Sequence, residues 1–265
     1  MKIGVVGAAG RMGRMLIRQV HETAGCTLAG AIDRAGAAEL GQDVGDLAGI
    51  GALGVTLGSD AAALFKAAQV VIDFTIPAAT VAHARLAAEQ GCNLVVGTTG
   101  LTAEHQAELD RAAQTIALMQ APNMSAGVVL LTALAEQVAR TLGVEYDIEV
   151  LEMHHRHKID APSGTALALG AAAAKGRAVD LAAASVRARD GHTGARPRGA
   201  IGFATLRGGD VVGDHSVIFA GEGERLELTH KAQSRVIYAA GAVRAARWTE
   251  GKPPGRYGMR DVLGL

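Results

Sequence analysis

The chain has 265 residues, of which 49% are hydrophobic and 20% charged, and its formal net charge is zero. These values describe a globular protein of one or two domains and exclude a disordered chain. Because aromatic residues make up only 3% and there is no basic excess, we expect neither nucleic acid nor a membrane among its partners.

The N-terminus and the two cysteines predict a cytoplasmic protein. The opening MKIGVVGAAG has one lysine and an apolar run that is too short, and too rich in glycine, for a secretion signal. Cys26 and Cys92 form no Cys-x-x-Cys pair, as expected in a reducing compartment. The longest apolar stretch, residues 126–135, is interrupted by Thr132 and closed by Glu136, short of a membrane span.

The first 124 residues alternate between short apolar runs and longer alanine-rich stretches. The apolar runs are continuous, which is typical of strands buried on both faces of a parallel sheet. Thr102 is a predicted helix N-cap and Gly91 a predicted helix stop. We therefore predict an α/β fold with a Rossmann-type doubly wound sheet, with strands at 2–6, 28–32, 70–74, 93–96 and 116–120, and helices including 11–22, 78–90 and 103–113.

The pattern then changes to a second, α+β part. We predict a mostly antiparallel sheet here, because alternating runs between residues 199 and 230 are separated by glycine-containing turns, as in an antiparallel meander. The basic stretch 187–198 is the best prediction for a mobile loop. The other predicted elements are helices at 125–142, 165–175 and 234–249, and a strand at 146–153.

A glycine-rich turn directly follows the first predicted strand. Its sequence is Gly7-Ala-Ala-Gly10-Arg-Met-Gly13, and a helix follows at once. Such a turn lets the backbone approach a pyrophosphate, although glycine turns are common in many folds. Asp33, twenty residues further on, could bind an adenosine ribose hydroxyl, and Arg34 could pair with a 2′-phosphate or simply be solvated. This pair predicts that either NADH or NADPH is accepted.

Two more loops leave predicted strands at their carboxyl ends, where open α/β sheets bind ligands. They are Gly97-Thr-Thr-Gly100 and Ala121-Pro-Asn-Met124. Their small hydroxyl side chains and free backbone groups suit a nicotinamide ring, but each could equally be an ordinary turn.

The stretch EMHHRHKIDAPSGTAL, residues 152–167, gathers three histidines, an arginine and a lysine within five positions. A metal site is disfavoured because neighbouring histidines on an extended segment point to opposite faces and no His-Glu-x-x-His motif occurs. A solvated basic loop is possible. An anion site explains more, because Pro162-Ser-Gly-Thr165 introduces a helix whose first N–H groups can hold a carboxylate beside His155 and Lys158.

These motifs, in this order and with the closing MRDVLGL, resemble the dihydrodipicolinate reductases (4-hydroxy-tetrahydrodipicolinate reductases) of bacterial lysine and diaminopimelate synthesis. The resemblance covers essentially the whole chain. It implies reduction of 4-hydroxy-tetrahydrodipicolinate to tetrahydrodipicolinate by NADH or NADPH, with loss of water. It also implies a homotetramer, a dinucleotide-binding domain of residues 1–125 and 235–265, and a substrate-binding and tetramerisation domain of residues 126–234.

The resemblance also implies roles for individual residues. His154 and Lys158 become the catalytic acid–base residue and proton donor, and either could deliver the proton. The substrate, a small dicarboxylate, would contact His155, Gly164 and Thr165, and no metal is implied. The implied cofactor contacts are Gly7, Ala8, Ala9, Gly10, Arg11, Met12, Asp33, Arg34, Gly97, Thr98, Thr99, Ala121, Pro122, Asn123 and Met124.

Two other functions stay open. A related dehydrogenase could use the same cofactor on another amine or imine, but it would not need two anion sites for a dicarboxylate. A nicotinamide-binding sensor without turnover is a third possibility, but cofactor binding alone requires neither His154 nor Lys158.

Overall fold

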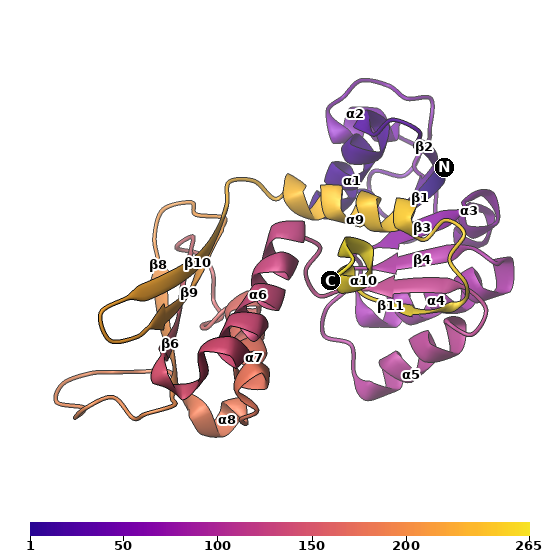
Figure 1. Cartoon of the computed structure of the whole chain (residues 1–265). Helices are drawn as coiled ribbons and strands as arrows, with labels where there is room; N and C mark the ends of the chain where they lie inside the picture. The colour runs from indigo at the N-terminus through magenta and orange to yellow at the C-terminus, as the bar shows by residue number, and fades with distance from the viewer. The chain divides into compact units, whose positions relative to one another are not determined.

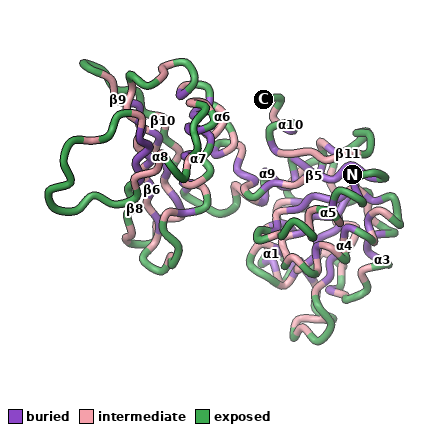
Figure 2. Tube along the Cα trace, turned by 90° about the horizontal axis from the view of Figure 1, so that it is seen from below, coloured by how far each residue is buried: buried purple, intermediate pink, exposed green.

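The computed structural model describes all 265 residues, which form two compact units. The first unit consists of Met1–Ser125 and Val236–Leu265, and the second of Ala126–Arg235. Each unit has its own buried interior, which follows its strands and the inner faces of its helices (Figure 2).

The first unit is built on a six-stranded sheet that is parallel throughout (Figure 1). The strand order is β11-β5-β4-β3-β1-β2, so the chain changes direction across the sheet at β1. This arrangement confirms the predicted Rossmann-type fold. The strands are β1 (Lys2–Val6), β2 (Thr27–Ile32), β3 (Val70–Asp73), β4 (Asn93–Val96), β5 (Ala117–Gln120) and β11 (Gly255–Tyr257).

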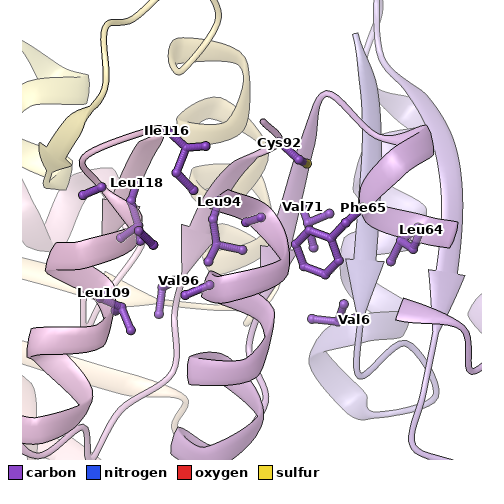
Figure 3. Close-up of a cluster of buried hydrophobic side chains, with 14 of the residues drawn as sticks. Val6, Leu64, Phe65, Val71, Cys92, Leu94, Val96, Leu109, Ile116 and Leu118 are labelled. Atoms are coloured by element: carbon purple, nitrogen blue, oxygen red, sulfur yellow. The ribbon is translucent and has the colours of Figure 1, made fainter. Parts of the chain in front are cut away.

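Helices cover this sheet on both faces. On one face, aliphatic side chains of the strands pack against Leu64 and Phe65 of one helix and Leu109 of another, and this cluster is shown in Figure 3. The capping predictions are confirmed: the Thr102 side chain accepts the His105 N–H, and Gly91 ends its helix with a φ of +65°. The helices are α1 (Arg11–Glu22), α2 (Val44–Ala48), α3 (Ala61–Ala67), α4 (Pro77–Gln90), α5 (Ala103–Ala112), α9 (Val236–Trp248) and α10 (Met259–Leu263).

The second unit is a five-stranded mixed sheet with two long helices on one face (Figure 1). Most of its paired residues are antiparallel, as predicted. The elements are α6 (Ala126–Leu142), a 3-10 turn η1 (Gly143–Glu145), β6 (Asp147–His154), α7 (Gly164–Arg177), α8 (Leu181–Ala184), β7 (Ser185–Val186), β8 (Ile201–Arg207), β9 (Gly213–Ala220) and β10 (Arg225–Ala232).

The predicted meander is wrong in one respect. The order is β10-β9-β6-β8-β7, so β6 lies between β8 and β9, and β8 runs parallel to β6 instead of pairing with β9. The physical reason is burial: β6 alternates buried and half-buried residues along its whole length and is the central strand over which α6 and α7 pack. This position brings the end of β6 next to the loop between β8 and β9.

Helix α6 with the turn after it is long and apolar enough, by length and composition, to cross a membrane. Leu131, Ala135 and Ala139 of this helix belong to the core of the second unit and pack against α7 and the sheet. Core helices pass the same test of length and composition, so the helix is weak support for a membrane span.

Candidate functional site

The glycine turn after β1 has the close packing that a dinucleotide loop requires. Gly7 has a φ of +66°, in the left-handed region that favours glycine, and its carbonyl accepts the Gly10 N–H at 3.1 Å. A Cβ added to Gly13 would lie 2.3 Å from the Gly7 carbonyl oxygen and 2.5 Å from the Ala8 Cα. The start of α1 can therefore approach β1 only because residue 13 is a glycine, and it points its first N–H groups at the turn.

Asp33 lies where the sequence predicted an acid, directly after β2. Its carboxylate accepts the Ala9 N–H at 2.9 Å and the Arg34 N–H at 2.8 Å. The acid thus links the glycine turn to the end of β2. Arg34 is exposed, and its guanidinium makes no hydrogen bond or ion pair with another side chain, so it is free to bind an anion.

A cavity of about 700 Å³ opens at this edge of the sheet. Its volume is in the range of small-molecule and cofactor sites. Five of the predicted cofactor residues line it: Gly7, Ala9, Gly10, Asp33 and Arg34. A Cβ on Gly7 would meet the Thr75 methyl group at 2.9 Å, so a larger residue would narrow the cavity.

The cavity also has a wall whose residues were not predicted from the sequence. Phe74, Thr75 and Ile76 follow β3, and Ala79 and His83 come from α4. These residues could have been predicted from the strand order. The order reverses between β1 and β3, and ligands of open α/β sheets bind at the carboxyl ends of the strands at this point.

A buried acid supports this wall. Asp73, at the end of β3, is fully buried and accepts hydrogen bonds from the Thr75 N–H and hydroxyl. Its second oxygen lies 2.8 Å from Nδ1 of His83. The carboxylate therefore orients the His83 ring at the cavity.

The other two predicted cofactor loops lie at the same edge, after β4 and β5. A Cβ on Gly97 would come within 2.3 Å of the Phe74 ring, which places this loop against the cavity wall. Thr98 points inward, where its hydroxyl bonds Thr80 and Asp73, whereas Thr99 is exposed. In the last loop Pro122 is exposed, whereas Ala121 and Met124 are buried and can offer a ligand only backbone groups. Of the rest, Ala8 is buried, Arg11 is exposed, and Met12 and Asn123 are half-buried.

In the second unit, the basic cluster forms a turn at the end of β6. The His154 carbonyl accepts the Gly208 N–H, and the His155 and Arg156 N–H groups bond to Val211 and Gly209 of the β8–β9 loop. His154 is the last residue of β6 and only 9% exposed. Its Nδ1 lies 2.5 Å from Glu152.

His155 and Lys158 have the chemistry of an anion site. The buried Nδ1 of His155 has no hydrogen-bond partner. Partial burial and the nearby cation of Arg235 lower the pKa of His155, which favours a neutral ring at pH 7. Lys158 Nζ binds both oxygens of Asp160, at 2.7 and 2.9 Å, and this pairing lowers the pKa of Asp160.

Helix α7 begins next to this turn, as the sequence indicated. Ser163 is its N-cap, and the Ser163 side chain accepts the Ala166 N–H at 3.1 Å. Gly164 is exposed and Thr165 half-buried at the first turn. The positive end of a fourteen-residue helix therefore lies in the loop that carries His155 and Lys158, and it favours a bound carboxylate.

Three arginines of the basic loop 187–198 bind carboxylates of this unit. Arg189 forms a two-pronged ion pair with Glu149, and Arg196 binds both Asp147 and Glu149. Burial raises the pKa of Glu149, but the two arginines outweigh it and lower the value. Arg198 pairs with Glu145. These contacts fasten the loop to β6 and the turn before it.

No group of three or more histidine, cysteine, aspartate or glutamate side chains has the arrangement of metal ligands. Within the cluster, Nδ1 of His154 faces Glu152, and the centroids of the His155 and His157 rings lie 6.3 Å apart.

The chain matches two family models that together cover nearly all of it. Residues 1–124 match the N-terminal part of dihydrodipicolinate reductase and residues 127–263 the C-terminal part. The 4-hydroxy-tetrahydrodipicolinate reductase of Methylocella silvestris is 58% identical over 265 residues, which is 100% of this chain and 97% of the relative. An enzyme of the same name from Rhizobium meliloti is 57% identical over 266 residues, again covering all of this chain and 98% of the relative.

Solved structures show the same fold. A dipicolinate-bound dihydrodipicolinate reductase from Paenisporosarcina sp. TG-14 superposes with a TM-score of 0.79, at 22% identity and with 98% of each chain covered. An amine dehydrogenase from Mycobacterium smegmatis gives a TM-score of 0.60 at 17% identity, covering 96% of this chain and 94% of that one. Together with the matches in sequence, the two-unit architecture and the glycine turn establish that the chain belongs to the dihydrodipicolinate reductase family.

Proposed function

We propose that the chain reduces 4-hydroxy-tetrahydrodipicolinate to tetrahydrodipicolinate in lysine and diaminopimelate synthesis, using NADH or NADPH. The observation that carries this proposal is the anion site of the second unit, where His155, Lys158 and the start of α7 come together in one loop beside His154. A dicarboxylate needs several such donors, and relatives more than 50% identical over the whole chain carry this enzyme's name.

The cofactor is assigned to the first unit. The residues fit a dinucleotide because the turn holds glycines at the two places where a Cβ would fill the loop or the cavity. When bound, the reduced nicotinamide supplies a hydride. Asp33 would hold a ribose hydroxyl, Arg34 a 2′-phosphate when the cofactor is NADPH, and the loops after β4 and β5 the nicotinamide end.

The substrate is assigned to the second unit, with one carboxylate held by the N-terminus of α7 at Gly164 and Thr165 and further contacts from His155. The reaction consumes one hydride and one proton, and the hydroxyl group of the substrate leaves as water. The proton comes from His154 or Lys158. Lys158 is paired with Asp160 in the structure, so a bound carboxylate would compete with Asp160 for its ammonium group.

We further propose that the chain is cytoplasmic and assembles as a homotetramer through the sheet of the second unit. The face of this sheet opposite α6 and α7 carries half-buried Leu151 and Met153 and Leu206, which is 48% exposed. Apolar side chains on an open sheet face favour a protein partner.

The test is oxidation of NADH and NADPH by the purified protein, followed by the loss of nicotinamide absorbance. The substrate is formed in situ from pyruvate and aspartate semialdehyde by the preceding synthase. Rapid oxidation that depends on the synthase product supports the proposal. Intact cofactor binding without oxidation would contradict it and point to a different imine or to a sensor.

A further inference from the structure

Glu152 is a buried carboxylate at the centre of the hydrogen bonds beneath the basic cluster. It is 1% exposed and lies two residues before His154, on the same face of β6. One oxygen accepts the Ser163 N–H at 3.0 Å and Nη2 of Arg207 at 3.1 Å. The other binds Nη1 of Arg207 at 2.9 Å and lies 2.5 Å from Nδ1 of His154. All hydrogen-bonding directions of a carboxylate are therefore in use.

The surroundings keep Glu152 ionised. Burial raises the pKa of Glu152, but the hydrogen bonds from Arg207, His154 and Ser163 outweigh burial and lower the value. An ionised carboxylate has no proton to donate, so the short contact to His154 requires that Nδ1 of His154 carries the hydrogen. The bidentate hydrogen bonds from Arg207 fix the plane of the Glu152 carboxylate, and therefore the direction from which it can accept the Nδ1 hydrogen of His154.

The other ring nitrogen of His154 is placed differently. Nε2 has no hydrogen-bond partner within the protein, and a Cβ added to Gly213 would lie 3.0 Å from it. With Nδ1 donating to Glu152, the neutral ring has its lone pair on Nε2, which lies beside Gly213 of β9.

We propose that Glu152 is a positioning residue for His154: it fixes the Nδ1–H tautomer and the ring orientation, so that Nε2 exchanges the proton with the substrate. This inference rests on the proposed function, in which His154 is an acid–base residue. When Nε2 accepts a proton, the charge of the imidazolium is balanced by Glu152, and Nδ1 keeps its own hydrogen. A carboxylate in this place has the role that an acid plays beside a catalytic histidine in other enzymes.

Glu152 also has structural contacts, so a test must separate the two roles. Arg207 donates to the Asp160 carbonyl as well, and Ser163 caps α7, so loss of Glu152 could loosen the loop. Glu136 provides a matched control. It is likewise a buried glutamate of the second unit with the cationic partners Arg140 and Lys175, but it lies on α6 and not on β6.

The first measurement needs only the wild-type protein. Histidine-selective 15N labelling and solid-state NMR at alkaline pH distinguish the two tautomers of a neutral ring, and the His154 signals are assigned by their absence in His154→Gln. We expect His154 to carry its hydrogen on Nδ1. A hydrogen on Nε2 would overturn the proposal, and this result does not depend on whether the protein turns over any substrate.

The second measurement compares Glu152→Gln, Glu152→Asp and Glu136→Gln. In Glu152→Gln we expect kcat to fall at least about 100-fold, the range of lost acid–base catalysis, with KM and the affinity for NADH changed by less than about threefold. Glu152→Asp, which keeps the charge, should recover at least about tenfold of that loss, and Glu136→Gln should keep the wild-type kcat. A Glu152→Gln enzyme with wild-type kcat, or an equal loss in Glu136→Gln, would overturn the proposal. Absence of turnover in the wild type would instead count against the proposed function.

Discussion

His215 gives the structure a pH-dependent stability that can be worked out in advance. It is opposite Glu152 on β9, 4% exposed, and its Nε2 lies 3.1 Å from the Ser163 hydroxyl. Burial, reinforced by the nearby charge of His154, lowers the pKa of His215 from 6.5 to about 4. The folded protein therefore holds this histidine neutral over a range where the unfolded chain protonates it.

The sign follows from this difference in proton binding. Between pH 6.5 and pH 4 the unfolded chain binds more protons at this site, so acidification stabilises the unfolded state. The separation of the two pKa values corresponds to about 3 kcal/mol of unfolding free energy once the pH is below both, at about 1.4 kcal/mol per unit. Roughly three quarters of this loss, between about 2 and 3 kcal/mol, is reached at pH 4.5. Above pH 7 the contribution is fully present.

The assay is urea unfolding of the wild type and of His215→Gln at pH 7.5 and pH 4.5, at one protein concentration. Glutamine can place a nitrogen near the position of Nε2 but does not titrate. We expect the wild type to lose between about 2 and 3 kcal/mol more unfolding free energy than the variant on acidification. His192→Gln, which removes a histidine from an exposed loop, controls for the substitution itself. A difference between wild type and His215→Gln that does not change with pH would refute the reasoning.

The remaining predictions concern the two ligand sites. Gly13→Ala should raise the Kd of NADH at least about tenfold in a fluorescence titration, because its Cβ would lie 2.3 Å from the Gly7 carbonyl and overpacking costs about 1–3 kcal/mol; unchanged affinity would show that the turn does not hold the cofactor. Arg34→Ala should weaken NADPH binding about tenfold or more and leave NADH binding nearly unchanged, as expected when one ion pair to the 2′-phosphate is lost. Asp33→Ala should weaken NADH binding more than NADPH binding. Equal losses of affinity for the two cofactors would contradict the roles given to Asp33 and Arg34. Lys158→Ala should lower kcat far more than it weakens cofactor binding, whereas similar losses in both would make Lys158 a structural residue.

The parts of the fold that periodicity determines could be predicted from the sequence. The buried strands β1 and β4 and helix α1 have the predicted bounds, because each is a regular apolar pattern with a clear start and stop. The short elements α2, α3, α8, β7, β11 and α10 were not predicted. They have two to seven residues each, too few for a period to be recognised, and their positions depend on tertiary contacts.

Residues of the candidate site could be predicted from the sequence where they are contiguous, but not where tertiary contacts bring them together. The glycine turn and the basic cluster are contiguous, so their residue types and spacing indicated anion and nucleotide binding. Arg207 and His215 lie more than fifty residues from Glu152 in sequence and join it only because β6 is placed between β8 and β9. The pairing order that the meander prediction missed is what builds the network around His154.

The most direct test of the account is the fate of the hydride. The protein is supplied with NADH deuterated at the transferred position of C4 and with substrate formed in situ by the synthase, and the product is examined by mass spectrometry. The account predicts tetrahydrodipicolinate that contains one deuterium and forms in step with cofactor oxidation. Oxidation of the cofactor without deuterium in this product would contradict it.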